Sequence, residues 1–282
     1  MGKQLVFGRK TLVMGVLNVT PDSFSDGGLY IDPKKAVGRA KEMVLEGADI
    51  IDVGGESTRP GSEPVSVDEE IKRVVPVIKE IKNTLPASDA VLISIDSYKS
   101  EVVRQALLEG ANIVNSLGGF LFDEKLADVA KEFNVPVIIY HIKGESKIMQ
   151  QEPVYKDVIK DIMGFFREQI KIGVSKGLKR EQFLVDPGIG FGKTVEQNLE
   201  IVKRLSEIKS LELPIVIGVS RKSHLGKLLQ EELKLDTLPS PTERLEASLA
   251  ETAIAVLSGA NIVRIHDVLQ TKKFLALLDR LK

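Results

Sequence analysis

The sequence predicts an α/β fold in which eight parallel strands close into a single (β/α)8 barrel, the TIM barrel, over residues 1–282. Eight short β-branched runs recur along the chain, amphipathic segments separate most of them, and nearly every run ends in a polar side chain. With 282 residues, 43% of them hydrophobic, the chain has the usual size of one such barrel. A doubly wound open sheet is the main alternative.

The predicted strands are near-continuous apolar runs, without the apolar/polar alternation of half-exposed strands. Parallel strands that helices cover on both faces have this pattern. The runs are TLVMGVLN (11–18), ADIIDVGG (48–55), VLISID (91–96), ANIVNS (111–116), VPVIIYH (135–141), FLVDPG (183–188), PIVIGVS (214–220) and ANIVRIHD (260–267).

The segments between the strands carry helix-boundary signals. The first has Asp32 as a candidate N-cap, Pro33 at the first helical position and Gly47 just past the end. Two later segments begin with candidate capping boxes, Ser66 with Glu69 and Thr194 with Gln197. Pro76 lies inside the segment that follows Ser66, and we expect it to kink or split that helix.

Composition excludes several functions. The formal net charge is −1, so no global field attracts the protein to nucleic acid or to a membrane surface. The absence of cysteine excludes disulfides, thiolate nucleophiles and cysteine metal sites. No apolar run approaches membrane-spanning length, and the N-terminus has no signal-peptide pattern, so we expect a cytoplasmic protein.

A polar side chain lies at the C-terminal end of nearly all of the eight runs, whereas the N-terminal ends show no such pattern. The C-terminal ends of barrel strands meet at one rim, where active sites of this fold lie. We therefore expect a small-molecule site there. The closing residues are Asn18, Gly54 to Glu56, Asp96, Asn115, His141, Asp186, Ser220 to Lys222, and Arg264 with His266.

Two of these residues are acids that each end an apolar strand, Asp96 and Asp186. A lone Asp at such a junction is as often a helix cap. Together with Asn115 and Lys222, however, the two carboxylates form a donor and acceptor set suited to a flat heterocycle with an amidine-like edge. We expect these four side chains to bind such a ring.

The last strand carries a candidate anion site. Arg264 and His266 are two residues apart, so both point to the same face. The last strands of such barrels commonly bind phosphate, and an Arg beside a helix N-terminus suits a diphosphate; the alternative is a surface Arg and a structural His. His141 could line the mouth, whereas a packing role is favoured for His224.

Three loops follow strand ends. TPDSFSDGG (20–28) and ESTRPGSEP (56–64) have the composition of mobile polar loops, and we expect them to act as lids. DPGIGFGKT (186–194) superficially looks like a phosphate-binding P-loop. Pro187 stands where that motif needs Gly, and the glycine spacing of a dinucleotide fingerprint is also absent. Its glycines instead suit close approach to a flat ligand, with Phe191 as an apolar wall.

Seven sequence motifs follow one another along essentially the whole chain. They are MGVLNVTPDSFSDGG (14–28), DVGGESTRPG (52–61), SIDSYKSEV (94–102), VNSLGG (114–119), DPGIGFGKT (186–194), GVSRKS (218–223) and VRIHDV (263–268). With these motifs in this order, the chain resembles the dihydropteroate synthase family. This resemblance implies a barrel, usually homodimeric, that joins 6-hydroxymethyl-7,8-dihydropterin diphosphate to p-aminobenzoate with Mg²⁺ present.

The resemblance also assigns roles to residues of this sequence. Asp96, Lys222, Arg264 and His266 would be catalytic. The pterin would be held by Asp96, Asn115, Asp186 and Lys222. The diphosphate would be bound by Arg264, His266, Asn18 and Thr58, with Asn18 also near the Mg²⁺. The p-aminobenzoate would be framed by Phe191, Ser220, Lys222, Arg59 and Pro60.

The sequence departs from the family pattern at Tyr140, where Met is common, and at His224, where the position is usually apolar. Two alternatives to the synthase remain. A pterin-dependent methyltransferase domain resembles this barrel but would not need TPDSFSDGG or SRKS, and both are present. A catalytically silent pterin-binding protein would be expected to have lost Arg264 or His266, which are intact.

Overall fold

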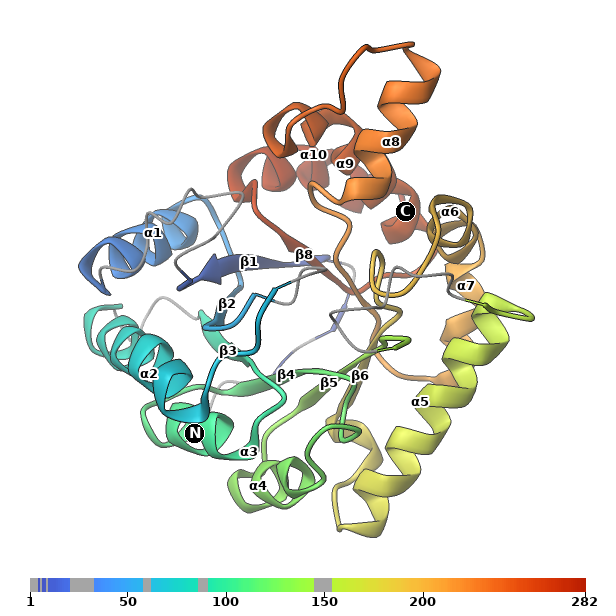
Figure 1. Cartoon of the computed structure of the whole chain (residues 1–282). Helices are drawn as coiled ribbons and strands as arrows, with labels where there is room; N and C mark the ends of the chain where they lie inside the picture. Colours follow the sequence, from blue (N-terminus) through green and yellow to red (C-terminus); the bar gives the residue numbers. More distant parts are fainter. Residues whose placement is uncertain are drawn as a thin grey trace.

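Eight parallel strands form one sheet that curves into a barrel, and the helices surround it (Figure 1). The computed structural model describes residues 5, 7, 8, 10–20, 33–57, 62–85, 91–144 and 154–282. Neighbouring strands follow the order β6-β5-β4-β3-β2-β1-β8-β7, and a parallel bridge between Val185 and Ile215 joins the two edges. The predicted TIM barrel is therefore confirmed, and the open-sheet alternative is wrong.

The strands are short and the helices that follow them are longer. The strands are β1 (Leu12–Asn18), β2 (Ile50–Gly54), β3 (Leu92–Asp96), β4 (Ile113–Leu117), β5 (Val137–Tyr140), β6 (Phe183–Asp186), β7 (Val216–Ile217) and β8 (Ile262–Ile265). The helices are α1 (Pro33–Leu45), α2 (Val67–Thr84), α3 (Ser100–Leu108), α4 (Lys125–Phe133), α5 (Val158–Ser175), α6 (Val195–Lys203), α7 (Leu205–Ile208), α8 (Ser223–Glu232), α9 (Leu245–Leu257) and α10 (Val268–Leu281). Three short 3-10 turns span Arg180–Gln182, Lys209–Leu211 and Pro241–Arg244.

The helix boundaries follow the predicted signals, with two corrections. Thr194 and Gln197 form the predicted capping box, whereas Ser66 caps Glu69 N without the reciprocal bond, because the Glu69 carboxylate pairs with Arg73. Of the kink or split predicted at Pro76, the split is wrong, since α2 runs through this residue. Pro76 is exposed, so the carbonyl that loses its helical partner can be hydrated. Asp32 lies outside the described residues.

The apolar core has two parts. Side chains between the strands and the helices form the larger one. The smaller one fills the barrel interior with one residue from each strand, as expected for a packed barrel with inward-pointing layers. Its members are Met14, Ile50, Leu92, Ile113, Ile138, Leu184, Val216 and Ile262. Within the described part of the chain, no helix is long and apolar enough to cross a membrane.

Candidate active site

Polar residues replace apolar ones directly above the apolar interior layer. Side chains alternate faces along a strand, so the residue two positions further on also points inward. Strand register places Asp52 beside Ser94 and Tyr140 beside Asp186, and it places Asn115 beside Asp96. Six of the eight positions carry hydrogen-bonding side chains. The second layer is Val16, Asp52, Ser94, Asn115, Tyr140, Asp186, Gly218 and Arg264.

Arg264 of β8 contacts one acid on β2 and one on β3. Its Nε lies 2.7 Å from Oδ2 of Asp52, and its Nη2 lies 2.6 Å from Oδ2 of Asp96. Nδ2 of Asn115 donates to the same Asp52 oxygen at 3.1 Å. Burial disfavours the charged guanidinium, but the two carboxylates raise the pKa of Arg264 above its ordinary value. The predicted gathering of Asp96, Asn115 and Arg264 at one mouth is thus observed.

Within the part of the chain that the structure describes, three buried oxygen atoms of the second layer have no protein partner. They are Oδ1 of Asp52, Oδ1 of Asn115 and Oγ of Ser94, and all three residues are at most 2% exposed. A buried polar atom without a partner destabilises a fold by about 1–3 kcal/mol. Such atoms grouped at a barrel mouth indicate a site that a polar ligand completes.

Burial perturbs both predicted acids. It raises the pKa of Asp96 to about 7, although Arg264 opposes the rise. Burial raises the pKa of Asp186 to about 6. The hydrogen bond that the Gly188 amide donates to Asp186 Oδ1 at 2.8 Å is the main cause that lowers this pKa in return. Two acids with raised pKa values at one barrel mouth are typical of a functional site.

An aromatic wall and a lysine complete one side of the mouth. Nζ of Lys222 lies 4.2 Å from the centre of the Phe191 ring, within the range of a cation–π contact. The Tyr140 ring meets Phe191 edge-on at 4.7 Å, and both belong to a buried cluster with Leu117 and Ile142. Tyr140 therefore shapes this wall.

His266 and Ser220 contact each other where the segments after β7 and β8 meet. The Ser220 hydroxyl accepts from the His266 amide at 3.2 Å and lies 3.0 Å from Nδ1 of its ring. Asp267, the next residue, pairs with Arg221 at 2.5 Å. Ser220, which the resemblance assigns to the p-aminobenzoate, thus orients His266.

Asn18 is the candidate metal ligand. A Cβ on Gly54 would lie 3.8 Å from Oδ1 of Asn18 and 3.7 Å from Oδ2 of Asp96, so glycine keeps the space between these oxygens open. Among the described residues, no group of three or more His, Cys, Asp or Glu side chains could cage a metal. An amide oxygen beside an acid suits Mg²⁺, which binds few protein ligands and takes the rest from phosphates and water.

The two remaining histidines lie away from the mouth. His141 is buried with Nδ1 at 3.0 Å from Nζ of Lys193 and its ring against the edge of Phe165. The suggestion that His141 lines the mouth is wrong, because it follows the inward-facing Tyr140 and so points outward. His224 is buried, with Nε2 at 3.0 Å from both carboxylate oxygens of Glu251.

Several predicted residues lie outside the described part of the chain: Thr58, Arg59, Pro60 and residues 21–28 of the first loop. Sequence reasoning missed Asp52, the fully buried acid that holds Arg264 and Asn115. A carboxylate inside the apolar run ADIIDVGG is the signal that could have revealed it, because an acid is rarely buried without a partner.

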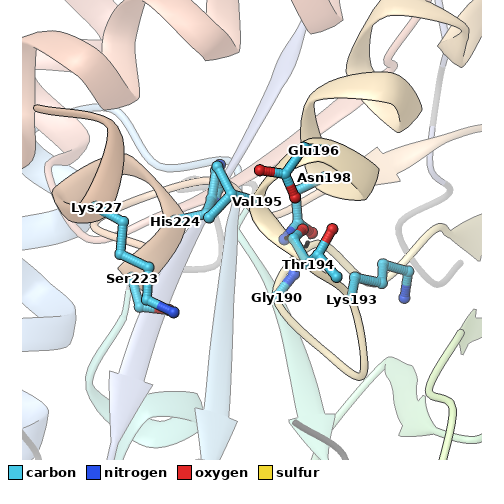
Figure 2. A pocket seen from close by; sticks show the side chains of 9 residues that line it. All are labelled: Gly190, Lys193, Thr194, Val195, Glu196, Asn198, Ser223, His224 and Lys227. Atoms are coloured by element: carbon cyan, nitrogen blue, oxygen red, sulfur yellow. Dashed lines mark hydrogen bonds between the residues drawn. The ribbon is translucent and has the colours of Figure 1, made fainter. Parts of the chain in front are cut away.

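A cavity of about 280 Å³ opens between the start of α6 and the start of α8 (Figure 2). It lies next to the mouth, because a Cβ on Gly190, one of its lining residues, would lie 3.3 Å from Cδ of Lys222. Both helix N-termini present amide groups, which favour anions. The lining residues are Gly190, Lys193, Thr194, Val195, Glu196, Asn198, Ser223, His224 and Lys227.

The fold and the polar mouth define a barrel enzyme with a site for a polar small molecule. Residues 14–266 match the family described as pterin binding enzyme. The chain belongs to this family and, within it, to the dihydropteroate synthases. It is 45% identical to the dihydropteroate synthase of Clostridium beijerinckii, covering 98% of this chain and 96% of the relative. It is 43% identical to that of Bacillus subtilis, covering 98% and 90%.

Solved structures of dihydropteroate synthases support the same family assignment. The crystal structure of Yersinia pestis dihydropteroate synthase with a sulfonamide drug complex superposes with a TM-score of 0.92 at 36% identity, covering 100% of this chain and 98% of the other. The Xanthomonas albilineans dihydropteroate synthase with 4-aminobenzoic acid gives a TM-score of 0.84 at 36% identity, covering 96% and 93%.

Proposed function

We propose that this protein joins 6-hydroxymethyl-7,8-dihydropterin diphosphate to p-aminobenzoate, forming 7,8-dihydropteroate and diphosphate in folate biosynthesis. The observation that carries the proposal is the ring of polar side chains above the apolar barrel interior, with buried oxygens that have no protein partner. Those oxygens match a planar ligand rich in N–H groups.

The pterin would lie across the second layer. Asp186 and Asn115 would accept from its ring N–H and amino groups, and Lys222 would donate to its acceptor atoms. Phe191 and Tyr140 would form the apolar wall against one edge. This arrangement uses the unpartnered Asn115 oxygen and keeps Asp186 ionised, because accepting hydrogen bonds favours the charged carboxylate.

The diphosphate would lie at the rim near Arg264 and His266, with Thr58 as a further contact. Among the described contacts of Arg264, Nε donates to Asp52 and Nη2 donates to Asp96. The N–H groups of Nη1 would then donate to phosphate oxygens. The start of α10 adds helix N-terminal amides. Mg²⁺, bound by Asn18 and the diphosphate, would neutralise negative charge on the leaving group.

We infer an SN1-like course in which the C–O bond to diphosphate breaks first, so no protein nucleophile is required. Arg264 and His266 then stabilise charge that develops on the leaving diphosphate. Asp96 faces the cationic pterin methylene, and its charged form stabilises that cation. The lid loops would exclude water, which would otherwise capture the cation before the arylamine does.

The p-aminobenzoate would approach along the Lys222 and Phe191 side, framed further by Arg59 and Pro60. We place its carboxylate toward the cavity between α6 and α8, whose lining includes the Ser223 hydroxyl and the Lys227 ammonium. An aryl carboxylate at the N-terminus of α8 would gain from the helix dipole.

We also propose a homodimer in the cytoplasm, as the family resemblance and the composition predict. Large apolar side chains are exposed on α9 and α10, among them Leu257 at 59% and Leu277 at 64%. A second copy would cover such a face. Sedimentation equilibrium of the wild type and of Leu257→Glu tests this; a monomeric wild type contradicts it.

The synthase assay supplies the pterin diphosphate, p-aminobenzoate and Mg²⁺ and measures both products. We expect dihydropteroate and diphosphate in equal amounts. Diphosphate release without dihydropteroate would contradict the proposal, and pterin binding without any turnover would favour the silent pterin-binding alternative. Methyl transfer from a methylated pterin would favour the methyltransferase.

A further inference from the structure

Lys193, the lysine of DPGIGFGKT, is turned back onto its own loop. Its side chain is buried, and Nζ lies 2.8 Å from the Gly188 carbonyl oxygen, 2.9 Å from that of Phe191 and 3.0 Å from Nδ1 of His141. Burial lowers the pKa of Lys193, whereas its three acceptors match the three N–H groups of an ammonium and so favour the charged form. A P-loop lysine reaches a phosphate, whereas this one holds backbone carbonyls. In Figure 2 its side chain points away from Ser223 and Lys227 on α8.

His141 is a fixed partner for this lysine. Its ring is 4% exposed and meets the edge of Phe165 at 4.9 Å. Burial and the nearby Lys193 lower the pKa of His141, so the ring is neutral and Nδ1 can accept from the ammonium. Lys193 therefore ties the loop after β6 to the segment after β5.

The loop is pressed closely against that segment. A Cβ on Gly188 would lie 1.8 Å from the His141 carbonyl oxygen, so only glycine fits. Tyr155 donates to the Gly192 carbonyl at 2.9 Å, and the Gly190 amide donates to Oδ1 of Asn198 at 2.7 Å. Lys193 adds hydrogen bonds to the carbonyls of Gly188 and Phe191, which flank the tip of the loop.

Those carbonyls belong to residues that set the mouth. The Gly188 amide donates to the Asp186 carboxylate, and Phe191 carries the ring beneath Lys222 and beside Tyr140. Holding the Gly188 carbonyl restrains Gly188, the residue whose amide donates to Asp186. Fixing the Phe191 carbonyl fixes the backbone from which the aromatic wall projects.

We propose that Lys193 is a positioning residue that presets Asp186 and Phe191 before the pterin arrives. This inference rests on the proposed function, because it assigns the pterin to these two side chains. Preset groups bind a ligand more tightly because the loop does not have to be ordered during binding. Loss of Lys193 should therefore change pterin affinity and KM, and this change can be measured separately from any change in the free energy of unfolding.

The first test compares Lys193→Met with Lys203→Met, a matched change at an exposed position on α6. Calorimetry without p-aminobenzoate gives the Kd of the pterin diphosphate, steady-state kinetics give KM and kcat, and thermal unfolding gives Tm. We expect Lys193→Met to raise Kd and the pterin KM about tenfold, the effect of one lost hydrogen bond. Lys203→Met should leave both within about twofold. A lower Tm with unchanged Kd and KM would overturn the proposal.

Chemical rescue gives a second readout. The chain has no cysteine, so Lys193→Cys introduces a unique thiol, which can be alkylated in denaturant before refolding. Aminoethylation regenerates a lysine-like ammonium, whereas carboxamidomethylation supplies a neutral amide of similar length. We expect the aminoethylated protein to recover the wild-type Kd and the carboxamidomethylated one to stay weak. Equal affinities for the two forms would refute a role for the ammonium.

Hydrogen exchange of the wild type keeps the proposal testable if the variants do not fold. The Gly190 and Phe191 amides are hydrogen-bonded and should exchange slowly without ligand. Slow exchange that appears only after pterin binds would contradict the proposal that this loop is fixed before binding. These outcomes are distinct from failure of the proposed function, in which the wild type itself would bind no pterin or form no dihydropteroate.

Discussion

Replacing Asp52 by Asn tests the role of the acid that sequence reasoning missed. The change preserves shape but removes a charge that accepts from Arg264 Nε at 2.7 Å and from Asn115 at 3.1 Å. Both bonds end on the same oxygen, Oδ2, and an amide oxygen in its place can still accept both, so the substitution removes the charge from the pair with Arg264. Replacing a charge-assisted hydrogen bond by a neutral one costs about 1 kcal/mol, which corresponds to roughly fivefold in rate when the loss is felt in the transition state.

The same substitution has a predicted effect on pH dependence. Burial is the main cause that raises the pKa of Asp96 to about 7, and the charge on Asp52 raises it further. Without that charge, the pKa of Asp96 falls. If Asp96 must be anionic to stabilise the cation, the acidic limb of the pH–rate profile moves to lower pH.

The assay is kcat for dihydropteroate formation from pH 5 to pH 9, with Asp49→Asn as the control. Asp49 precedes the same strand at its opposite end and pairs with Lys272, so its kcat should stay within about twofold of the wild type. A normal kcat for Asp52→Asn, or an acidic limb that moves to higher pH, would refute the proposed network.

Three other substitutions have distinct expected outcomes. Arg264→Ala should lower kcat by at least about 100-fold while changing pterin affinity little, because its charge acts on the leaving group; an unchanged rate rejects that role. Asp186→Asn should weaken pterin binding about tenfold, since an amide cannot accept from two N–H groups; calorimetry showing equal affinity counts against it. Lys99→Met should lower the free energy of unfolding by about 3 kcal/mol at pH 8, because Lys99 pairs with Glu56 and buried Glu70. Burial raises the pKa of Glu70, so protonation relieves the loss as pH falls toward 5; urea titrations showing a larger loss at pH 5 would contradict this.

The barrel could be predicted from sequence because its signals are local. Near-continuous apolar runs indicate buried parallel strands, and Pro33 and Thr194 mark helix starts where the structure has them. The polar residues at strand ends could be predicted to gather at one rim because barrel topology brings those ends together. Asp96, Asn115 and Arg264 meet there as expected.

Pairing and side-chain direction could not be predicted in the same way. Asn115 was expected at a strand end but lies in the middle of β4, where it pairs with Asp96 because the strands are staggered. His141 is one residue beyond an inward position, and a shift of one residue reverses its face. Contacts across 212 positions, such as Asp52 with Arg264, depend on strand register, which the sequence does not state.

A crystal structure of the protein with a bound pterin tests the central claim most directly. The account predicts that the ring lies over the second layer, with its N–H groups near the Asp186 carboxylate and the Asn115 oxygen that has no protein partner. A pterin bound in the cavity between α6 and α8, with the barrel mouth unchanged, would contradict it.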